Sequence, residues 1–381
     1  MAEDFIQDDL PPPFTRDEYA ARLAALRARM ARAGLDLLVI DQFEHMVYFG
    51  GHLPTAAMYQ CLLVPLSGTP VMVIRALDAQ VFHETSWLDR CTAFGDAEDP
   101  IAVASAEITA LGLAAGRIGL EGDSHFMTLD RADAFRAALP DARFQTFSGE
   151  MWEMRQVKSP AELAHLEQAA RICDRATLAG FAAAQAGVNE REVTAAITAE
   201  ALRNGADNTR LVLMASGPRS AALHGALGQR VLAPGDLLHV EMVPHFRGYT
   251  SRIMRPKSIG APDEEQLRIA ETMVSIQDAQ YAAMTPGAKA SEVDRILREG
   301  ILSAGLRDSY SNVTGYTLGL VFIPRTSDFT RVFQAESRWT LEENTVFHMY
   351  AWAGGMAFSD TVVVTPQGGR RMTALPRVLA Q

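Results

Sequence analysis

A stretch past the middle of the chain carries more information about the fold than any other. It reads Gly235-Asp-Leu-Leu-His-Val-Glu-Met-Val-Pro-His-Phe-Arg-Gly-Tyr-Thr-Ser-Arg-Ile-Met-Arg255, and the pattern of its residues is typical of β-strands. Glu241 lies in this pattern between Val240 and Met242. Because neighbouring side chains in a strand point to opposite faces, we expect the Glu241 carboxylate to point into a cleft.

Three further segments follow this stretch in order along the chain. They are Thr314-Gly-Tyr-Thr-Leu-Gly-Leu320, Thr345-Val-Phe-His-Met-Tyr350 and Phe358-Ser-Asp-Thr-Val-Val-Val-Thr365. Together the four segments resemble the metal-binding segments of the pita-bread peptidases. That family includes methionine and proline aminopeptidases, prolidase, creatinase and ectoine hydrolase. The resemblance covers the whole chain in order and is more specific in the second half.

The residues at the metal-binding positions differ from those of the metal-dependent members. The family pattern supplies two Asp, one His and two Glu, and the matching residues here are Glu241, Arg252, Tyr316, Tyr350 and Ser359. One carboxylate among five positions is too few to hold a pair of divalent ions. We therefore expect no metal ligands and no cofactor.

The resemblance also implies a fold. We expect a two-domain α/β chain, with a small α/β N-terminal domain and a C-terminal pita-bread domain in which helices cover a curved antiparallel sheet. The expected parts are a polar arm, a creatinase-like domain, a connector and a catalytic domain, at residues 1–14, 15–150, 151–160 and 161–381.

Bulk composition excludes several classes of protein. The formal net charge is -11, which offers no electrostatic surface for nucleic acid or for an anionic membrane. The three cysteines have no metal-ligand spacing, and the N-terminal residues are acidic where a signal peptide would be basic. We expect a cytoplasmic protein that acts on a small molecule.

His224 is the strongest single candidate for catalysis. It ends the loop Ser216-Gly-Pro-Arg-Ser-Ala-Ala-Leu-His224, which resembles the loop before the metal hairpin in proline peptidases and in creatinase. In creatinase the matching His is implicated in proton transfer. An imidazole titrates near neutral pH, which suits general acid–base catalysis. The alternative is a His that only caps a turn.

Two interpretations of Glu241 stay open. A lone carboxylate in a cleft can orient water or pair with a cationic nitrogen of the substrate. Alternatively Glu241 forms an ion pair with Arg252 or Arg255 across the hairpin, in place of the metal bridge. Both can hold if the pair orients Glu241 for substrate.

Aromatic residues are expected to form the substrate wall. Tyr316 and Tyr350 combine an apolar ring with a hydroxyl, and they either bind substrate or fill the space of the missing ions. Phe322, His348 and Trp352 add apolar surface or belong to the core.

Three more residues are candidates for substrate binding. Arg325 resembles, with a gap, the creatinase Arg that holds the substrate carboxylate. His52 and Tyr59 lie in or after a glycine-opened loop that in creatinase-like dimers reaches the partner's active site. The resemblance therefore implies a homodimer. The alternative for Arg325 is an exposed, solvated side chain, and the alternative for the loop with His52 and Tyr59 is a plain connector.

The resemblance is closest to the metal-independent branch of creatinase and ectoine hydrolase. It implies hydrolysis of a C–N bond in a small nitrogenous metabolite, such as an ectoine-like cyclic amidine or a related amide. His224 would transfer the proton, and Glu241 would orient water or substrate. Two alternatives remain, namely a metal-dependent Xaa-Pro-type peptidase and a catalytically inactive pita-bread domain that binds a ligand or a protein.

Overall fold

A computed structural model describes residues 12–207, 212–322 and 325–381, so most of the predicted polar arm lies outside the described residues. The chain forms two compact units, Met1–Met154 and Arg155–Gln381, which are described separately. In the described ranges, no helix combines the length and the apolar character needed to cross a membrane.

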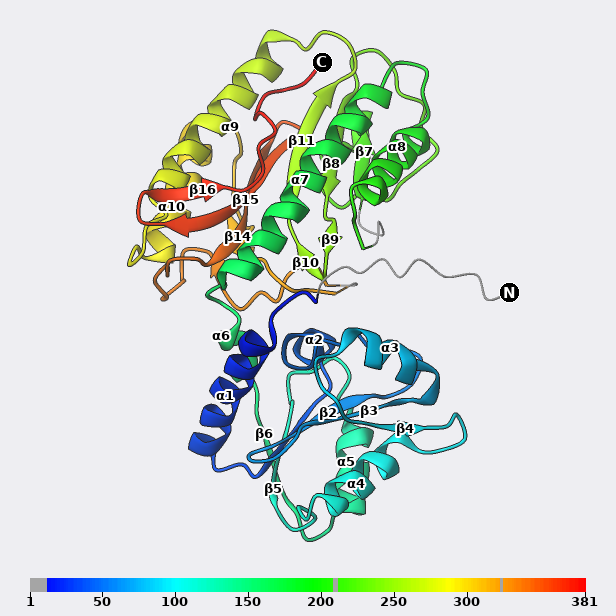
Figure 1. Ribbon diagram of the computed structural model, residues 1–381. Helices are drawn as coiled ribbons and strands as arrows, with labels where there is room; N and C mark the ends of the chain where they lie inside the picture. The colour runs from blue at the N-terminus through cyan, green and yellow to red at the C-terminus, as the bar shows by residue number, and fades with distance from the viewer. Residues whose placement is uncertain (1–11, 208–211, 323–324) are drawn as a thin grey trace, which may run out of the picture. The chain divides into compact units, whose positions relative to one another are not determined.

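The N-terminal unit is a six-stranded mixed sheet with helices packed against it (Figure 1). The strand order is β4-β3-β2-β1-β5-β6, in which β1–β2 and β2–β3 are antiparallel and the other pairs are parallel. The strands are β1 (Leu37–Ile40), β2 (Cys61–Pro65), β3 (Val71–Arg75), β4 (Cys91–Phe94), β5 (Arg117–Leu120) and β6 (Arg143–Thr146). The helices are α1 (Arg16–Ala33), α2 (Phe43–Gly50), α3 (Ala79–Thr85), α4 (Pro100–Ala110), α5 (Leu129–Ala138) and α6 (Glu150–Met154).

Local signals set the ends of the helices. Thr15 caps α1 by accepting a hydrogen bond from the Glu18 amide, and Gly34 ends it in the left-handed conformation at φ 69°. In the second unit, Ser159 and Glu162 form a capping box at the start of α7 (Pro160–Ala183).

The C-terminal unit is an eight-stranded sheet whose described strand pairs are all antiparallel. The order is β13-β12-β14-β15-β11-β8-β7, and β16 pairs with β15. The strands are β7 (Val212–Ser216), β8 (Leu237–Met242), β11 (Ile253–Ser258), β12 (Gly315–Thr317), β13 (Val332–Phe333), β14 (Val346–Ala353), β15 (Met356–Thr365) and β16 (Gly368–Arg371). A separate small ribbon joins β9 (His245–Phe246) and β10 (Tyr249–Thr250). These findings confirm the predicted two-domain α/β fold with an antiparallel pita-bread sheet.

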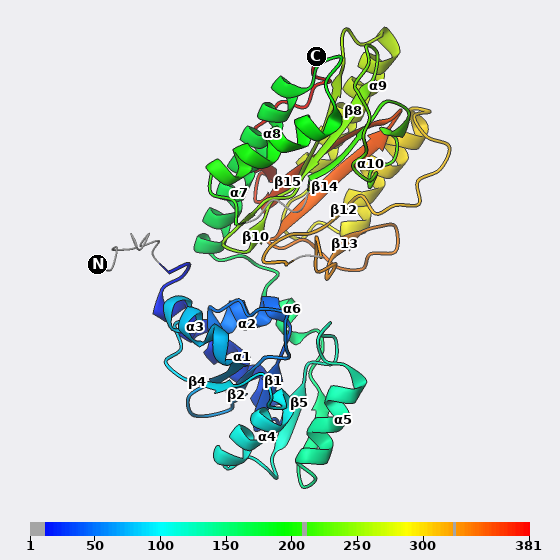
Figure 2. The ribbon, with the colours of Figure 1, turned by 90° about the vertical axis from the view of Figure 1, so that its right-hand side faces the viewer.

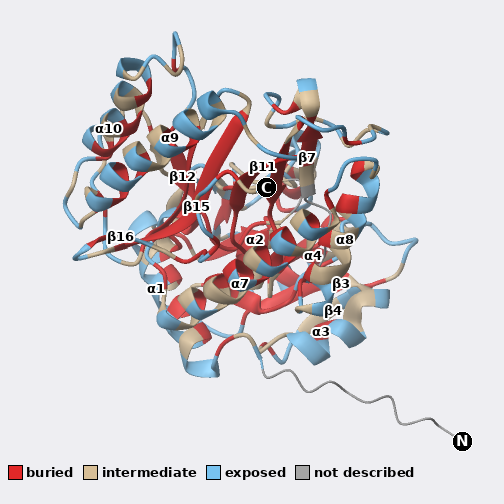
Figure 3. Ribbon diagram, turned by 90° about the horizontal axis from the view of Figure 1, so that it is seen from above, coloured by how far each residue is buried: buried red, intermediate tan, exposed pale blue. Residues whose placement is uncertain are grey.

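Two helix pairs cover one face of this sheet. They are α7 with α8 (Glu190–Arg203) and α9 (Glu264–Ala282) with α10 (Ala290–Ser303). The first pair packs on side chains such as Val240 and Ile253, and the second on side chains such as Phe358. Figure 2 shows strands β8, β12 and β14 between the two pairs, and Figure 3 shows that the strands are largely buried. Because side chains alternate along each strand, those between the helix-packed residues point to the face of the sheet that the helices do not cover.

Candidate active site

The face of the sheet away from the helices carries two rows of side chains that cross the strands. Antiparallel register places Glu241 opposite Met254, Met254 opposite Ser359, and Ser359 opposite Tyr350. Two residues away along the same strands, a second row is formed by Arg252, Thr361, His348 and, on the next strand, Tyr316. All five positions that match the family's metal ligands thus lie together.

A buried ion pair joins the two rows. The Nε and Nη2 atoms of Arg252 contact Oε1 of Glu241, and Nη1 of Arg252 donates a hydrogen bond to the Tyr316 hydroxyl oxygen. Burial works to raise the pKa of Glu241, but the charge of Arg252, the nearby His239 and the hydrogen bond from Arg252 hold that pKa below its usual value. Glu241 is therefore an ionised partner of a fixed guanidinium, and its other oxygen lies 3.9 Å from His239 Nε2.

Aromatic rings surround this pair. The Tyr316 ring centroid lies 4.8 Å from that of Phe329 and 5.1 Å from that of His348, and the His348 ring stacks on Tyr350 at 5.4 Å. Burial, followed by the charge of Arg252, lowers the pKa of His348 well below its usual value. His348 is therefore a neutral, buried residue near pH 7 rather than an acid–base group.

A pocket of about 350 Å³ opens over these residues. It brings together four residues predicted from the sequence, namely His224, Arg252, Tyr316 and Tyr350. Trp352, expected from the sequence as apolar wall or core, also lines the pocket. Sequence reasoning did not assign the other lining residues to substrate; these are Ala221, Leu223, Met254, Asn312, Val313, Thr326 and Phe329. Phe329 has a positive φ of 53°, a conformation that no local signal in the sequence predicts for an aromatic residue.

The His224 side chain is exposed and reaches the pocket from a loop rather than from the sheet. The buried carboxylate of Glu190 holds this loop, since it accepts hydrogen bonds from Ser216 Oγ at 2.7 Å, from the Gly228 amide at 2.6 Å, and from Arg219. Burial acts to raise the pKa of Glu190, and these hydrogen bonds outweigh it and lower the pKa. Glu190 is a positioning residue that the sequence did not reveal, because its partners follow 26 to 38 residues later.

Glu241, His348, Phe322 and Arg325 are not among the described residues that line the pocket. Glu241 is fully buried because its carboxylate is taken up by Arg252. The Phe322 ring packs at Gly248, where an added Cβ would lie 2.8 Å from the ring. These placements put Glu241 and His348 beneath the pocket surface.

His52 and Tyr59 belong to the N-terminal unit and are buried there. His52 Nδ1 lies 3.0 Å from Thr85 Oγ1, and burial lowers the pKa of His52 to about 4. The Tyr59 ring packs against Phe135 at 6.2 Å and beneath the Arg131 guanidinium at 4.8 Å. Their contact with a partner's substrate stays a prediction.

The residues at the family's ligand positions do not fit a pair of divalent metal ions. A guanidinium is permanently charged and cannot donate an electron pair to a metal, and here it occupies the only carboxylate of the five. Elsewhere in the described ranges, no group of three or more His, Cys, Asp or Glu side chains is arranged to hold a metal ion.

Comparison with known proteins identifies the family. Residues 164–366 match the metallopeptidase family M24, and residues 22–157 match the creatinase/prolidase N-terminal domain. The chain belongs to the M24 family of pita-bread hydrolases. This finding confirms the resemblance seen in the sequence.

The relatives have several different activities in their names. The chain is 27% identical to an uncharacterized hydrolase/peptidase of Sinorhizobium fredii, over 97% of this chain and 98% of that protein. It is 23% identical to the ectoine hydrolase of Halomonas elongata, over 96% of this chain and 98% of that protein. It is 29% identical to a Xaa-Pro dipeptidase of Pyrococcus furiosus, over 69% of this chain and 75% of that protein.

Solved structures agree on the fold. The dipeptidase PepE of Mycobacterium ulcerans superposes with a TM-score of 0.81 and 26% identity, covering 96% of this chain and 98% of that chain. The X-Pro aminopeptidase of Thermotoga maritima gives a TM-score of 0.83 at 23% identity, covering 94% and 99%.

Proposed function

We propose that this M24 member hydrolyses a C–N bond other than a peptide bond in a small nitrogenous metabolite, without the two-metal centre. The observation that carries the proposal is the contact of Arg252 with both Glu241 and Tyr316, at three of the five family ligand positions. A cation built into the ligand set opposes metal binding and at the same time supplies a fixed hydrogen-bond donor.

In the proposed reaction, His224 accepts a proton from water as the water oxygen attacks the carbon of the scissile bond. His224 then gives that proton to the leaving nitrogen as the C–N bond breaks. His224 suits this role because it is exposed at the pocket, and among the described contacts no hydrogen bond holds its imidazole.

Tyr316 is the proposed donor to the oxygen or nitrogen that gains negative charge. Its hydroxyl oxygen accepts a hydrogen bond from Arg252, so its own proton is left to point into the pocket. Burial raises the pKa of Tyr316 above its usual value, which keeps the phenol protonated at neutral pH. Glu241 acts through Arg252 and is a positioning residue in this scheme.

The pocket surface favours a flat, weakly charged substrate. Its described lining includes Tyr316, Phe329, Tyr350 and Trp352 and has no Asp or Glu. A strongly cationic guanidinium would lack a carboxylate partner there, which argues against creatine and fits a cyclic amidine or an amide. The ectoine hydrolase of Halomonas elongata among the relatives supports the same class.

We expect the activity to be independent of divalent ions. Protein dialysed against a chelator would be tested on ring amidines, N-acyl amino acids and Xaa-Pro dipeptides, with and without Mn²⁺, Co²⁺ or Zn²⁺. The expected result is turnover of an amidine or amide that added metal leaves unchanged, with far less than one ion per subunit by mass spectrometry. Tightly held metal together with cleavage of Xaa-Pro dipeptides would instead assign the peptidase activity. Binding without turnover would assign an inactive ligand-binding domain.

Replacing Tyr316 by Phe tests the proposed donor. We expect kcat to fall by about 10²-fold, because one hydrogen bond to the developing charge is lost, while KM changes little. Tyr350→Phe is the matched control, since Tyr350 lines the same pocket and the described contacts show no hydrogen bond from its hydroxyl to protein. Equal losses in the two variants would contradict a specific role for Tyr316.

A further inference from the structure

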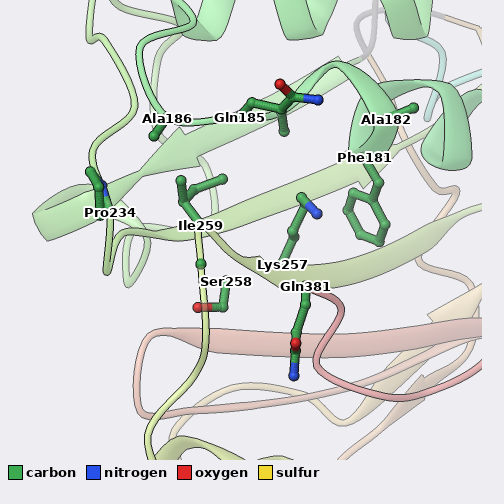
Figure 4. A pocket seen from close by; sticks show the side chains of 11 residues that line it. Phe181, Ala182, Gln185, Ala186, Pro234, Lys257, Ser258, Ile259 and Gln381 are labelled. Carbon is green, nitrogen blue, oxygen red and sulfur yellow. The ribbon is translucent and has the colours of Figure 1, made fainter.

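A second pocket lies on the helix-covered side of the same sheet. Its volume is about 470 Å³, and it shares no lining residue with the pocket over Arg252. It is built from the end of α7, the loop after it and the end of β11, as Figure 4 shows. Lys257 and Arg252 lie an odd number of residues apart on the chain, so strand alternation turns Lys257 to the face opposite Arg252.

Lys257 is a largely buried residue whose amino group faces this pocket. The residue is only 7% exposed, and in Figure 4 its side chain reaches up beside Phe181. Its Nζ lies 5.9 Å from the centre of the Phe181 ring. Among the described residues, no carboxylate lies within ion-pair distance of Lys257 Nζ, and no group forms a hydrogen bond with Nζ. Burial alone lowers the pKa of Lys257, with no acidic neighbour to offset it.

The other lysines show that this situation is exceptional for the chain. Lysine occurs only three times, although lysine and arginine together number 35. Lys158 donates to the Gln156 carbonyl at 3.0 Å, and Lys289 lies 3.1 Å from Glu292. Lys257 alone of the three has no partner among the described residues. A partly desolvated cation with no protein partner is left to be paired by an anion from outside the chain.

We propose that this pocket binds a small monocarboxylate with a short apolar tail. The carboxylate would pair with Lys257 Nζ, and the tail would lie against the apolar part of the wall, which includes Phe181, Ala184 and Ile259. A single cation matches one negative charge better than the two of a phosphate. The volume falls in the range usual for small-ligand sites. The proposal does not depend on the reaction at the other pocket.

The first test uses the wild-type chain and needs no turnover. Reductive methylation at neutral pH would be followed by peptide mass spectrometry, with and without hexanoate. We expect saturating hexanoate to slow the methylation of Lys257 several-fold and to leave Lys289 unchanged. Hexan-1-ol, which has the same tail and no charge, should protect Lys257 far less. No protection by hexanoate, or equal protection by hexan-1-ol, would overturn the proposal.

The second test compares two variants by calorimetry with hexanoate as the titrant. Lys257→Met keeps an unbranched side chain and removes the charge, and we expect it to weaken hexanoate binding by at least about tenfold. Lys289→Met is the matched control and should bind like the wild type, because Lys289 is exposed and is not one of the residues that line the pocket. Unchanged binding in Lys257→Met would show that Lys257 does not recognise the carboxylate.

Discussion

Replacing Glu241 by Ala should lower the free energy of unfolding by about 3–5 kcal/mol, because a buried guanidinium would then lack its counter-charge. Glu241 is fully buried, and the side chain of Arg252 is 3% exposed. Chemical denaturation monitored by circular dichroism would measure the change. The exposed pair Arg295–Glu299, at 3.2 Å, provides the matched control, since Glu299→Ala should cost well under about 1 kcal/mol.

A double variant separates the charge from the packing. Replacing Glu241 by Leu and Arg252 by Met together removes both charges and keeps apolar volume, so we expect most of the lost stability to return. The double variant should nevertheless be inactive, because Tyr316 would lose the donor that orients it. If the double variant is as unstable as Glu241→Ala, the unpaired charge of Arg252 is not the source of the lost stability.

The contribution of Glu241 to the free energy of unfolding should also depend on pH. The folded-state pKa of Glu241 lies below its usual value, so the unfolded state binds a proton more readily. Its stabilising contribution is therefore fully present above the unfolded pKa and is lost as the pH falls through the folded pKa. The difference in stability between the wild type and Glu241→Ala should narrow in acid.

Replacing His224 by Ala should abolish most of the turnover of the amidine or amide substrate. We expect kcat to fall by about 10²–10⁴-fold, the usual contribution of a general acid–base group. The melting temperature should stay within error of the wild type, because the His224 side chain is exposed. Steady-state kinetics of the wild type and the variant would measure the loss.

Two controls make this result specific. Gln229→Ala alters an exposed side chain farther along the same loop and should leave kcat unchanged. Added imidazole should restore part of the activity of His224→Ala if the missing group transfers a proton. Full activity in His224→Ala would remove this residue from the mechanism, and equal loss in Gln229→Ala would point to the loop conformation instead.

The local order of the fold could be predicted from the sequence. The capping residues Thr15 and Ser159 and the apolar periodicity after them act over a few residues, so α1 and α7 were predictable along with the later long helices. The strands around Glu241 and Arg252 were predictable for the same reason, as was the family's fold. That the positions matching the family's ligands hold Arg and Tyr could also be predicted, because this depends only on residue type.

The working arrangement of the site required the tertiary structure. Arg252 and Tyr316 are 64 residues apart, and only the register of β11, β15, β14 and β12 brings the guanidinium to the phenol. Glu190 holds the His224 loop through partners on a separate strand and loop, and Lys257 lacks a partner only because of what folds around it. Contacts between distant segments depend on the packing of whole strands and helices, which no short stretch of residues specifies.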